Sequence, residues 1–221
     1  MEYKRFNLLL RQGSDSLAVE VDEQQSRRLY DYFSELKRWS RKVNLISRNA
    51  TDEEIVEKHF LDSLALLDLL KGPSASLLDV GSGAGFPGLV CKAVRLDLRV
   101  GLVEPRLKRV SFLRHICRLL DLAEIEVHGC RLEDQTLAGE STFDWVVSRA
   151  VAEIGDFLTL CSRFKEYGSS VVCMKGPRYL DELDDKTITA KGWRLVDTKA
   201  YLLPFSGAQR SLLVFRALDL S

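Results

Sequence analysis

Four glycines lie within the eight residues GSGAGFPG, Gly81 to Gly88, directly after the mostly apolar run SLLDV. Glycine at this density indicates backbone that bends sharply or that lets a ligand come close. Read from Gly83, the stretch has the G-x-G-x-x-G spacing of a loop that binds the pyrophosphate of a dinucleotide. Read from Gly81, it has the G-x-G-x-G spacing of a loop that binds S-adenosylmethionine. The first cofactor would serve hydride transfer and the second methyl transfer.

Two carboxylates flank this loop, and one of them helps to separate the two interpretations. Glu104 lies 23 residues after Gly81 and 21 after Gly83, so either cofactor could present its ribose hydroxyls to it. Asp79 lies two residues before the loop, where its charge would repel a pyrophosphate but attract an ammonium or a sulfonium group. We therefore favour S-adenosylmethionine, and keep a dinucleotide and a tight turn without a ligand as alternatives.

The elements that would position this loop begin with helices and continue with an alternation of strands and helices. Apolar residues recur at helical spacing from Asp22, and a second helix is predicted from Thr51, where Thr51 and Glu54 form a capping box, to Gly72. Further helices are predicted at 87–94, 106–120, 154–164 and 180–192. Strands are predicted at 76–80, 99–104, 125–129, 143–151, 169–176, 193–204 and 210–218.

This order of elements predicts an α/β fold. Alternating strands and helices indicate a Rossmann-like, mostly parallel sheet of about seven strands, and the last two strands are close enough in sequence to form an antiparallel pair. We assign residues 73–221 to this methyltransferase-like domain and residues 1–72 to an N-terminal helical extension. The first 20 or so residues give weak signals, and we expect them to be only partly ordered.

The composition is that of an ordinary globular protein, and it excludes several classes. The formal net charge is zero, so no overall field attracts nucleic acid or an anionic membrane. No apolar run approaches the roughly 18 residues that span a bilayer, and the amino terminus has no convincing cleavage site, so we expect a cytoplasmic protein. The five cysteines and three histidines have neither paired nor metal-ligand spacing, so we expect reduced thiols and no metal site.

A set of short motifs resembles a known family, the bacterial 16S rRNA guanine-N7 methyltransferases, once called glucose-inhibited division protein B. The motifs are NLIS (44–47), HFLDSL (59–64), LLDVGSGAGFPG (77–88), LVEPRLKRVSFLR (102–114), CRLED (130–134), FDWVVSRA (143–150) and MKG (174–176). The glycine loop with its Phe-Pro-Gly ending, together with HFLDSL, is the most specific part. The resemblance covers residues 25 to 217 approximately.

The resemblance implies a class I S-adenosylmethionine-dependent methyltransferase that modifies N7 of one guanine in the 530 loop of 16S rRNA. N7 is a ring nitrogen with a free lone pair, so its methylation needs alignment of the reactants and no general base. We therefore assign no certain catalytic residue and keep Arg149 and Lys175 as candidates. The expected cofactor-binding residues are Asp79, Gly81, Gly83, Gly85, Phe86, Glu104, Leu132, Glu133 and Arg149.

Local charge is uneven although the net charge is zero. A basic run with no acidic residue spans positions 37 to 48 and contains Trp39, and an aromatic residue within a basic cluster is typical of RNA contact. A second basic run lies between Arg106 and Arg118, although such runs are more often solvated helix faces. His59 and Asp62 lie three residues apart, where they could line an RNA entrance. The RNA-binding candidates are Lys37, Arg38, Arg41, Lys42, His59 and Asp62.

The expected partner is 16S rRNA or the small ribosomal subunit, with no membrane and with a monomer favoured. Two other classes of function stay open. One is an NAD(P)-dependent oxidoreductase, for which the chain leaves no room for a substrate domain after the sheet. The other is a non-catalytic RNA-binding module that keeps a methyltransferase fold. A methyltransferase with another substrate also stays open, because the cofactor-binding motifs say little about the methyl acceptor.

Overall fold

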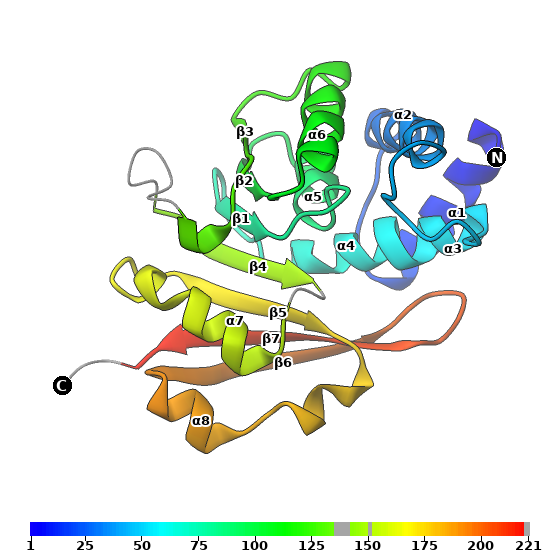
Figure 1. Ribbon diagram of the computed structural model, residues 1–221. Helices are drawn as coiled ribbons and strands as arrows, with labels where there is room; N and C mark the ends of the chain where they lie inside the picture. Colours follow the sequence, from blue (N-terminus) through cyan, green and yellow to red (C-terminus); the bar gives the residue numbers. More distant parts are fainter. Residues whose placement is uncertain (135–141, 150–151, 219–221) are drawn as a thin grey trace.

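The computed structural model describes residues 1–134, 142–149 and 152–218. These residues form one seven-stranded sheet of order β3-β2-β1-β4-β5-β7-β6 (Figure 1). Strand β7 is antiparallel to both of its neighbours and the other pairs are parallel, which confirms the predicted sheet and its terminal antiparallel pair. The strands are β1 (Ser76–Val80), β2 (Arg99–Val103), β3 (Ile125–His128), β4 (Trp145–Arg149), β5 (Ser170–Lys175), β6 (Trp193–Leu202) and β7 (Gln209–Ala217).

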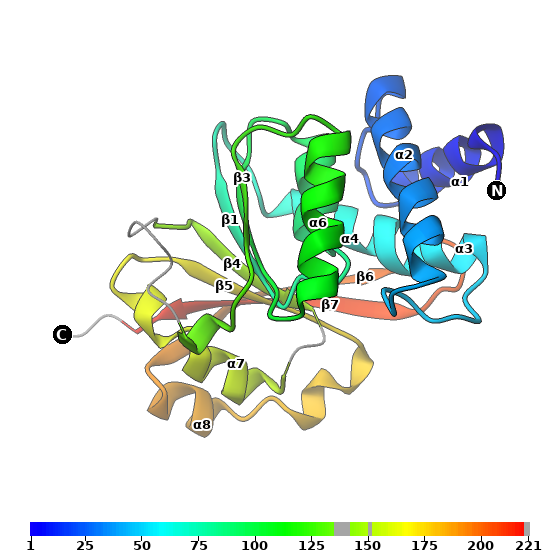
Figure 2. The same ribbon diagram turned by 45° about the horizontal axis from the view of Figure 1, so that its top comes forward.

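Helices cover both faces of the sheet, as Figures 1 and 2 show. One face carries α5 (Gly88–Val94), α6 (Leu107–Leu119) and the N-terminal helices, and the other carries α7 (Ile154–Leu160) and α8 (Asp185–Ala190). Three short 3₁₀ helices lie in the connections: η3 (Leu132–Asp134) follows β3, η4 (Ser162–Lys165) follows α7, and η5 (Pro177–Asp181) follows β5. Residues 150 and 151, at the end of the strand predicted for 143–151, lie outside the described residues.

The N-terminal layer consists of α1 (Tyr3–Ser16), α2 (Glu23–Ser40) and a helical run over residues 52–68. Both later helices begin with capping boxes, Asp22 with Gln25 and Thr51 with Glu54, so the second confirms its prediction. The helical run changes its winding three times. It contains α3 (Asp52–Ile55), the π-helix η1 (Val56–Leu61), α4 (Asp62–Leu64) and the 3₁₀ helix η2 (Ala65–Asp68).

Helix α1 corrects the expectation that the first 20 residues are only partly ordered. Phe6, Leu9 and Leu10 lie on one face of α1 and are buried against the layer, where the Phe6 ring packs on Phe33 and Phe60. This face was hard to predict because α1 also contains Gly13, Ser14 and Asp15, which disfavour helix in isolation. Tertiary burial supplies the stability that the local sequence lacks.

The N-terminal helices share one hydrophobic core with the sheet. A single cluster of buried side chains includes Phe6 and Leu29 from the first two helices, Leu77 from β1, and Leu89 and Phe112 from α5 and α6. A division of the chain at residue 72 therefore stays a prediction.

Among the described residues, no helix is long and apolar enough to cross a membrane. The same residues contain no group of three or more histidine, cysteine, aspartate or glutamate side chains that could hold a metal ion.

Candidate cofactor loop and the polar network beside it

The glycine loop leaves the carboxyl end of β1 and is fastened to the end of β2. The amides of Gly81 and Ser82 both donate to the carbonyl of Val103, at 2.8 and 3.0 Å. Gly81, Gly83 and Gly85 have positive φ angles of 72°, 60° and 99°, which side chains rarely tolerate. The backbone therefore makes the sharp turns that the glycine density predicts, at the edge of the sheet where ligands bind in such folds.

The glycines of the loop serve different purposes. At Gly83, a Cβ would lie in ordinary contact with the Arg109 guanidinium, at 3.7 Å, and with the Gly81 carbonyl, at 3.8 Å, so packing leaves room for a side chain there and the positive φ is the reason for glycine. At Gly85, a Cβ would lie 2.5 Å from the Tyr32 hydroxyl and 2.9 Å from Leu89. At Gly88, a Cβ would lie 2.8 Å from the Asp79 Cβ. Packing within the protein is thus a reason for glycine at positions 85 and 88, and at Gly85 it stands beside the ligand approach expected from the sequence.

Asp79 is fully buried beneath the loop. Its Oδ2 accepts the amide hydrogen of Gly88 at 2.9 Å, whereas its Oδ1 is buried without a hydrogen-bond partner. Burial raises the pKa of this carboxyl to about 7, because the charged form loses water without gaining a full set of partners. An unpartnered carboxylate oxygen is chemically suited to a cationic ligand and unsuited to a pyrophosphate.

Glu104 is held against the same loop. Its Oε2 accepts the amide hydrogen of Gly83 at 3.0 Å and lies 3.6 Å from the Arg109 guanidinium, while its Oε1 accepts from the amide of Arg106 at 2.9 Å. The structure thus brings the two carboxylates singled out in the sequence to one loop. Contact between Glu104 and ribose hydroxyls stays a prediction.

Leu132 and Glu133 lie in η3, beyond the end of β3. The Leu132 side chain is buried, and the Glu133 side chain is exposed. Strands β3 and β2 are neighbours in the sheet, so η3 follows the strand beside the one that ends at Glu104. Their expected role at the adenine of a cofactor stays a prediction.

Arg149 ends β4 and reaches across to the π-helix of the N-terminal layer. Its guanidinium donates to the Lys58 carbonyl at 2.9 Å, to Asp62 Oδ2 at 3.2 Å and to His59 Nδ1 at 3.2 Å. Burial and the neighbouring guanidinium lower the pKa of His59 to about 3, so the imidazole is neutral and its Nδ1 accepts. Residues predicted separately as cofactor and RNA contacts therefore form one network.

Asp62 is the centre of that network and has more partners than the sequence indicated. In addition to Arg149, it accepts from the Tyr201 hydroxyl at 2.8 Å and lies 3.6 Å from the Arg210 guanidinium. Tyr201 and Arg210 belong to β6 and β7 and were missed, because nothing local in the sequence relates them to position 62.

Phe86 is a core aromatic residue between the loop and the N-terminal layer. Its ring is stacked with Tyr32 at 5.6 Å on a nearly parallel plane and with His59 at 4.9 Å, and the Arg149 guanidinium lies 5.2 Å from its centroid. The side chain is 4% exposed, so the neighbours that it contacts are protein groups. A cofactor contact of Phe86 stays a prediction.

Lys175, the other catalytic candidate, ends β5 and is engaged within the protein. Its ammonium donates to Glu182 Oε2 at 2.6 Å and to the Ala152 carbonyl at 2.8 Å. Glu182 also accepts the amide hydrogen of Ile154, at the start of α7. These contacts give Lys175 a role in joining η5 to α7, and contact with a substrate stays a prediction.

The predicted RNA-binding cations fall into two groups. Lys37 forms an ion pair with Asp52, and Arg38 forms one with Glu35 at 2.6 Å. Arg41 and Lys42, with Arg48 at the end of the same basic run, are exposed, as Arg38 is, but have no ion pair among the described residues. Lys37, Arg41 and Arg48 also line a cavity of about 410 Å³ beneath the loop that follows α2.

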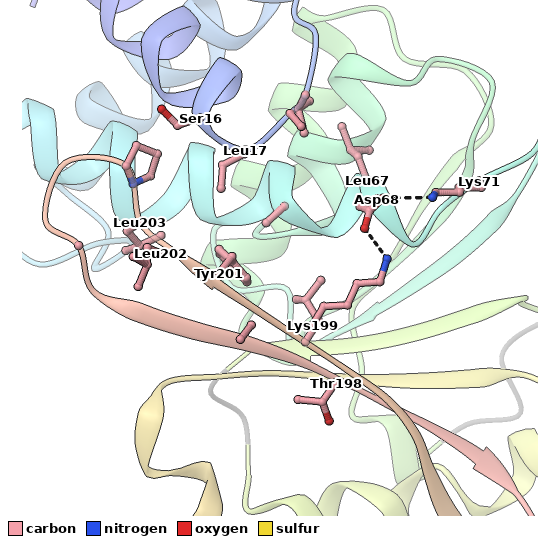
Figure 3. Close-up of a pocket in the computed structure, with 17 residues that line it drawn as sticks. Ser16, Leu17, Leu67, Asp68, Lys71, Thr198, Lys199, Tyr201, Leu202 and Leu203 are labelled. Carbon is pink, nitrogen blue, oxygen red and sulfur yellow. Dashed lines mark hydrogen bonds and ion pairs between the residues drawn. The ribbon is translucent and has the colours of Figure 1, made fainter.

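Figure 3 shows a larger cavity, of about 1170 Å³, on the other side of the Asp62 network. It is enclosed by the segment after α1, by η2 and by the β6–β7 hairpin, and Lys199 forms an ion pair with Asp68 at its edge. Tyr201 lines it. None of the residues that line this cavity belongs to the glycine loop, so its size does not make it the cofactor site.

The sheet order and the glycine loop after β1 define a Rossmann-like fold of the kind found in class I methyltransferases. A mutant of MtNAS crystallised with S-adenosylmethionine is similar in fold, with a TM-score of 0.55 and 17% identity over 88% of this chain and 76% of that one. TYW2 from M. jannaschii, crystallised with AdoMet, gives a TM-score of 0.52 and 14% identity over 67% of this chain and 72% of that one. At these identities the likeness establishes the fold.

Sequence comparison gives the particular family. The model of the family GidB, described as rRNA small subunit methyltransferase G, matches residues 25–212. The Ribosomal RNA small subunit methyltransferase G of Desulfotalea psychrophila is 48% identical over 219 residues, which cover 98% of this chain and all of that protein. The chain therefore belongs to the rRNA small subunit methyltransferase G family.

Proposed function

We propose that the protein transfers a methyl group from S-adenosylmethionine to N7 of a guanine in the 530 loop of 16S rRNA. Family membership supports methyl transfer to small-subunit rRNA. The observation that carries the cofactor assignment is Asp79, whose Oδ1 is buried beneath the glycine loop without a hydrogen-bond partner. The choice of N7 and of the 530 loop follows from the family resemblance.

Different residues of the chain bind different parts of the cofactor in this proposal. We assign the backbone of Gly81, Gly83 and Gly85 to the methionine and ribose portions, and Glu104 to the ribose hydroxyls. Asp79 serves the cationic part of the cofactor, where its charge is worth most because water is excluded. Leu132 and Glu133 serve the adenine, and Phe86 closes the loop against the N-terminal layer.

Arg149 is suited to an anion at the same edge of the sheet. An arginine has five N–H donors, and three bonds to protein acceptors leave two donors for a cofactor carboxylate or an RNA phosphate. The network around Asp62 fixes the guanidinium before any ligand arrives, so little conformational entropy is lost on binding. We assign Arg149 to binding and alignment, and Lys175 to the outer part of the RNA path.

The chemistry asks for alignment more than for proton transfer. S-adenosylmethionine supplies the methyl group on a sulfonium, and guanine N7 supplies its own lone pair. The protein must hold the two in line and exclude water, and correct orientation of this kind is worth on the order of 7–11 kcal/mol of the barrier. His59, neutral and bonded to Arg149, is a positioning group in this scheme.

The RNA would be met by the exposed cations that follow α2. Arg41, Lys42 and Arg48 are exposed, whereas Lys37 and Arg38 are partly neutralised by carboxylates. Arg109 joins this segment to the cofactor loop, because it donates to the Asn44 carbonyl at 3.3 Å and pairs with Glu104. The Arg41→Ala, Arg48→Ala double variant should weaken RNA binding. The slope of log K against log salt concentration should also become shallower, by the amount expected for about two lost phosphate contacts. Lys186→Ala, on the distant α8, should leave both unchanged.

The decisive experiment is mass mapping of 16S rRNA from cells with and without the gene. Loss of one N7-methylguanine in the 530 loop on deletion, and its return with the wild-type gene, is the expected result. Retention of the modified base after deletion would refute the assignment. Binding of NADH in place of S-adenosylhomocysteine, measured by calorimetry on the purified protein, would refute the cofactor.

A matched pair of glycine variants tests the loop itself. Gly83→Val should abolish binding of S-adenosylhomocysteine, because it adds a side chain at φ 60° within the proposed cofactor loop. Gly168→Val imposes the same strain at φ 68°, with no protein atom within 4 Å of the new Cβ, at the turn before β5. Equal losses of cofactor affinity in the two variants would contradict the role of Gly83.

A further inference from the structure

Tyr32 of α2 is a fully buried residue that contacts the cofactor loop from the N-terminal layer. Its hydroxyl donates to the backbone carbonyl of Ala84, 52 positions further along the chain. Its ring is stacked on Phe86, two residues beyond Ala84 in the same loop. The residue therefore meets the loop at two points that differ in chemistry, one polar and one aromatic.

The polar contact completes the fastening of one peptide group. The carbonyl of Ala84 accepts from Tyr32, and the amide of the same peptide, on Gly85, donates to the Ser82 carbonyl at 2.7 Å. A peptide group is planar, so fixing both of its ends fixes its orientation. The preceding loop amide, on Gly83, is bonded to Glu104 at 3.0 Å. The loop is thus oriented from β2 on one side and from α2 on the other.

Gly85 records how closely Tyr32 approaches. A Cβ at this position would lie 2.5 Å from the Tyr32 hydroxyl, so a larger residue would displace the hydroxyl or the loop. The Tyr32 ring is also packed edge-on against Phe60 at 5.2 Å, which leaves it no room to swing away. Burial raises the pKa of Tyr32 well above its usual value, so the hydroxyl stays protonated and remains a donor.

We propose that Tyr32 is a positioning residue that holds the cofactor loop in its binding conformation, so that the N-terminal layer takes part in cofactor affinity. This inference rests on the proposed cofactor loop. Without the hydroxyl, the Ala84–Gly85 peptide keeps only the bond from the Gly85 amide to Ser82, so its carbonyl end is less firmly held and ligand binding has to order it. The effect appears in affinity, because Tyr32 is fully buried and contacts the loop itself.

The test compares two variants that each remove one tyrosine hydroxyl from α2. Tyr32→Phe removes the bond to Ala84, and Tyr30→Phe removes a bond of the same kind, from Tyr30 to the Met1 carbonyl at 3.2 Å. The dissociation constant for S-adenosylhomocysteine is measured by calorimetry, at a temperature well below the unfolding midpoints of both. Tyr32→Phe should weaken binding about tenfold, as loss of one buried hydrogen bond predicts, and Tyr30→Phe less than twofold.

Steady-state kinetics provide a second readout that a merely structural role would not move. In Tyr32→Phe the KM for S-adenosylmethionine should rise about tenfold while kcat at saturating cofactor stays within a factor of two of the wild type. An affinity within twofold of the wild type, or equal losses in both variants, would overturn the inference and leave the proposed function standing. Failure of the wild-type protein to bind S-adenosylhomocysteine would overturn both.

Discussion

Two buried aspartates, 17 positions apart in the sequence, differ in how many partners their carboxyl groups have. Asp62 is 4% exposed, and its carboxylate is matched by Arg149, Arg210 and Tyr201. Asp79 is 0% exposed, and one of its oxygens has no partner. A buried charge that is fully paired supports the fold, whereas one that is left short of partners costs stability and is retained where a ligand completes it. The contrast separates the scaffold from the binding site.

Loss of Asp62 should have the largest effect, which is a decrease in the free energy of unfolding. Asp62→Ala removes the carboxylate that two guanidinium groups and a partly buried tyrosine hydroxyl share, which should cost about 3 kcal/mol, the lower end for a broken buried pair because both arginines are partly solvated and Arg149 keeps two other acceptors. The midpoint of thermal unfolding should then fall on the order of 10 °C. Differential scanning calorimetry measures this change.

Asp68 provides the matched control for that experiment. It lies in the same helical run and also pairs with a residue of β6, Lys199, but its side chain is half exposed. Asp68→Ala should cost less than about 1 kcal/mol, as exposed ion pairs do. Equal losses in the two variants would remove the distinction between the buried network and an ordinary surface pair.

Loss of the charge on Asp79 should act on binding and leave the fold intact. Asp79→Asn keeps an oxygen for the Gly88 amide but offers no charge to a cationic ligand, so the affinity for S-adenosylhomocysteine should fall roughly 10- to 100-fold. The pKa of Asp79 is raised in the folded state, so the stability that its protonated form provides is lost as pH rises towards 7. The asparagine variant escapes that loss. Its unfolding midpoint at pH 8 should be equal to or above that of the wild type.

The smallest effect is a pH dependence of cofactor binding. Below the pKa of about 7, Asp79 has to release a proton before it can face a cation. Affinity for S-adenosylhomocysteine should therefore tighten by up to about tenfold per pH unit below 7 and level off above it. Calorimetry between pH 5.5 and 8.5 measures the slope of affinity against pH. Repeating it in buffers of different ionisation enthalpy measures the number of protons released on binding. A slope that persists in Asp79→Asn would assign the proton to another group.

What the sequence predicts well is local. The strands, the capping box at Thr51 and the turns at the glycines follow from neighbouring residues, and the structure confirms them. The two carboxylates beside the loop could be found because Asp79 lies in the strand before the loop and Glu104 follows the next strand along the chain. Their spacing is fixed by the length of a single strand and helix.

What the sequence did not predict depends on residues far apart. Tyr201 lies 139 positions from Asp62, and Arg149 lies 87 positions from it, so no spacing rule connects them. The contact of Tyr32 with the loop could not be predicted either, because an aromatic residue on an amphipathic helix indicates only a core position. Helix α1 was missed for a related reason, since its order comes from packing on other helices. These are the positions where tertiary structure decides.

The π-helix of Val56–Leu61 can also be understood as a rotation. A helix that closes its turn with one residue more than an α-helix shifts everything beyond it by about 100° around the axis. Ile55, before that turn, is buried in the N-terminal core, and Asp62, directly after it, meets Arg149 and the β6–β7 hairpin. A chain shortened by one residue within the turn would keep the first half of this helix in place and point Asp62 away from both partners.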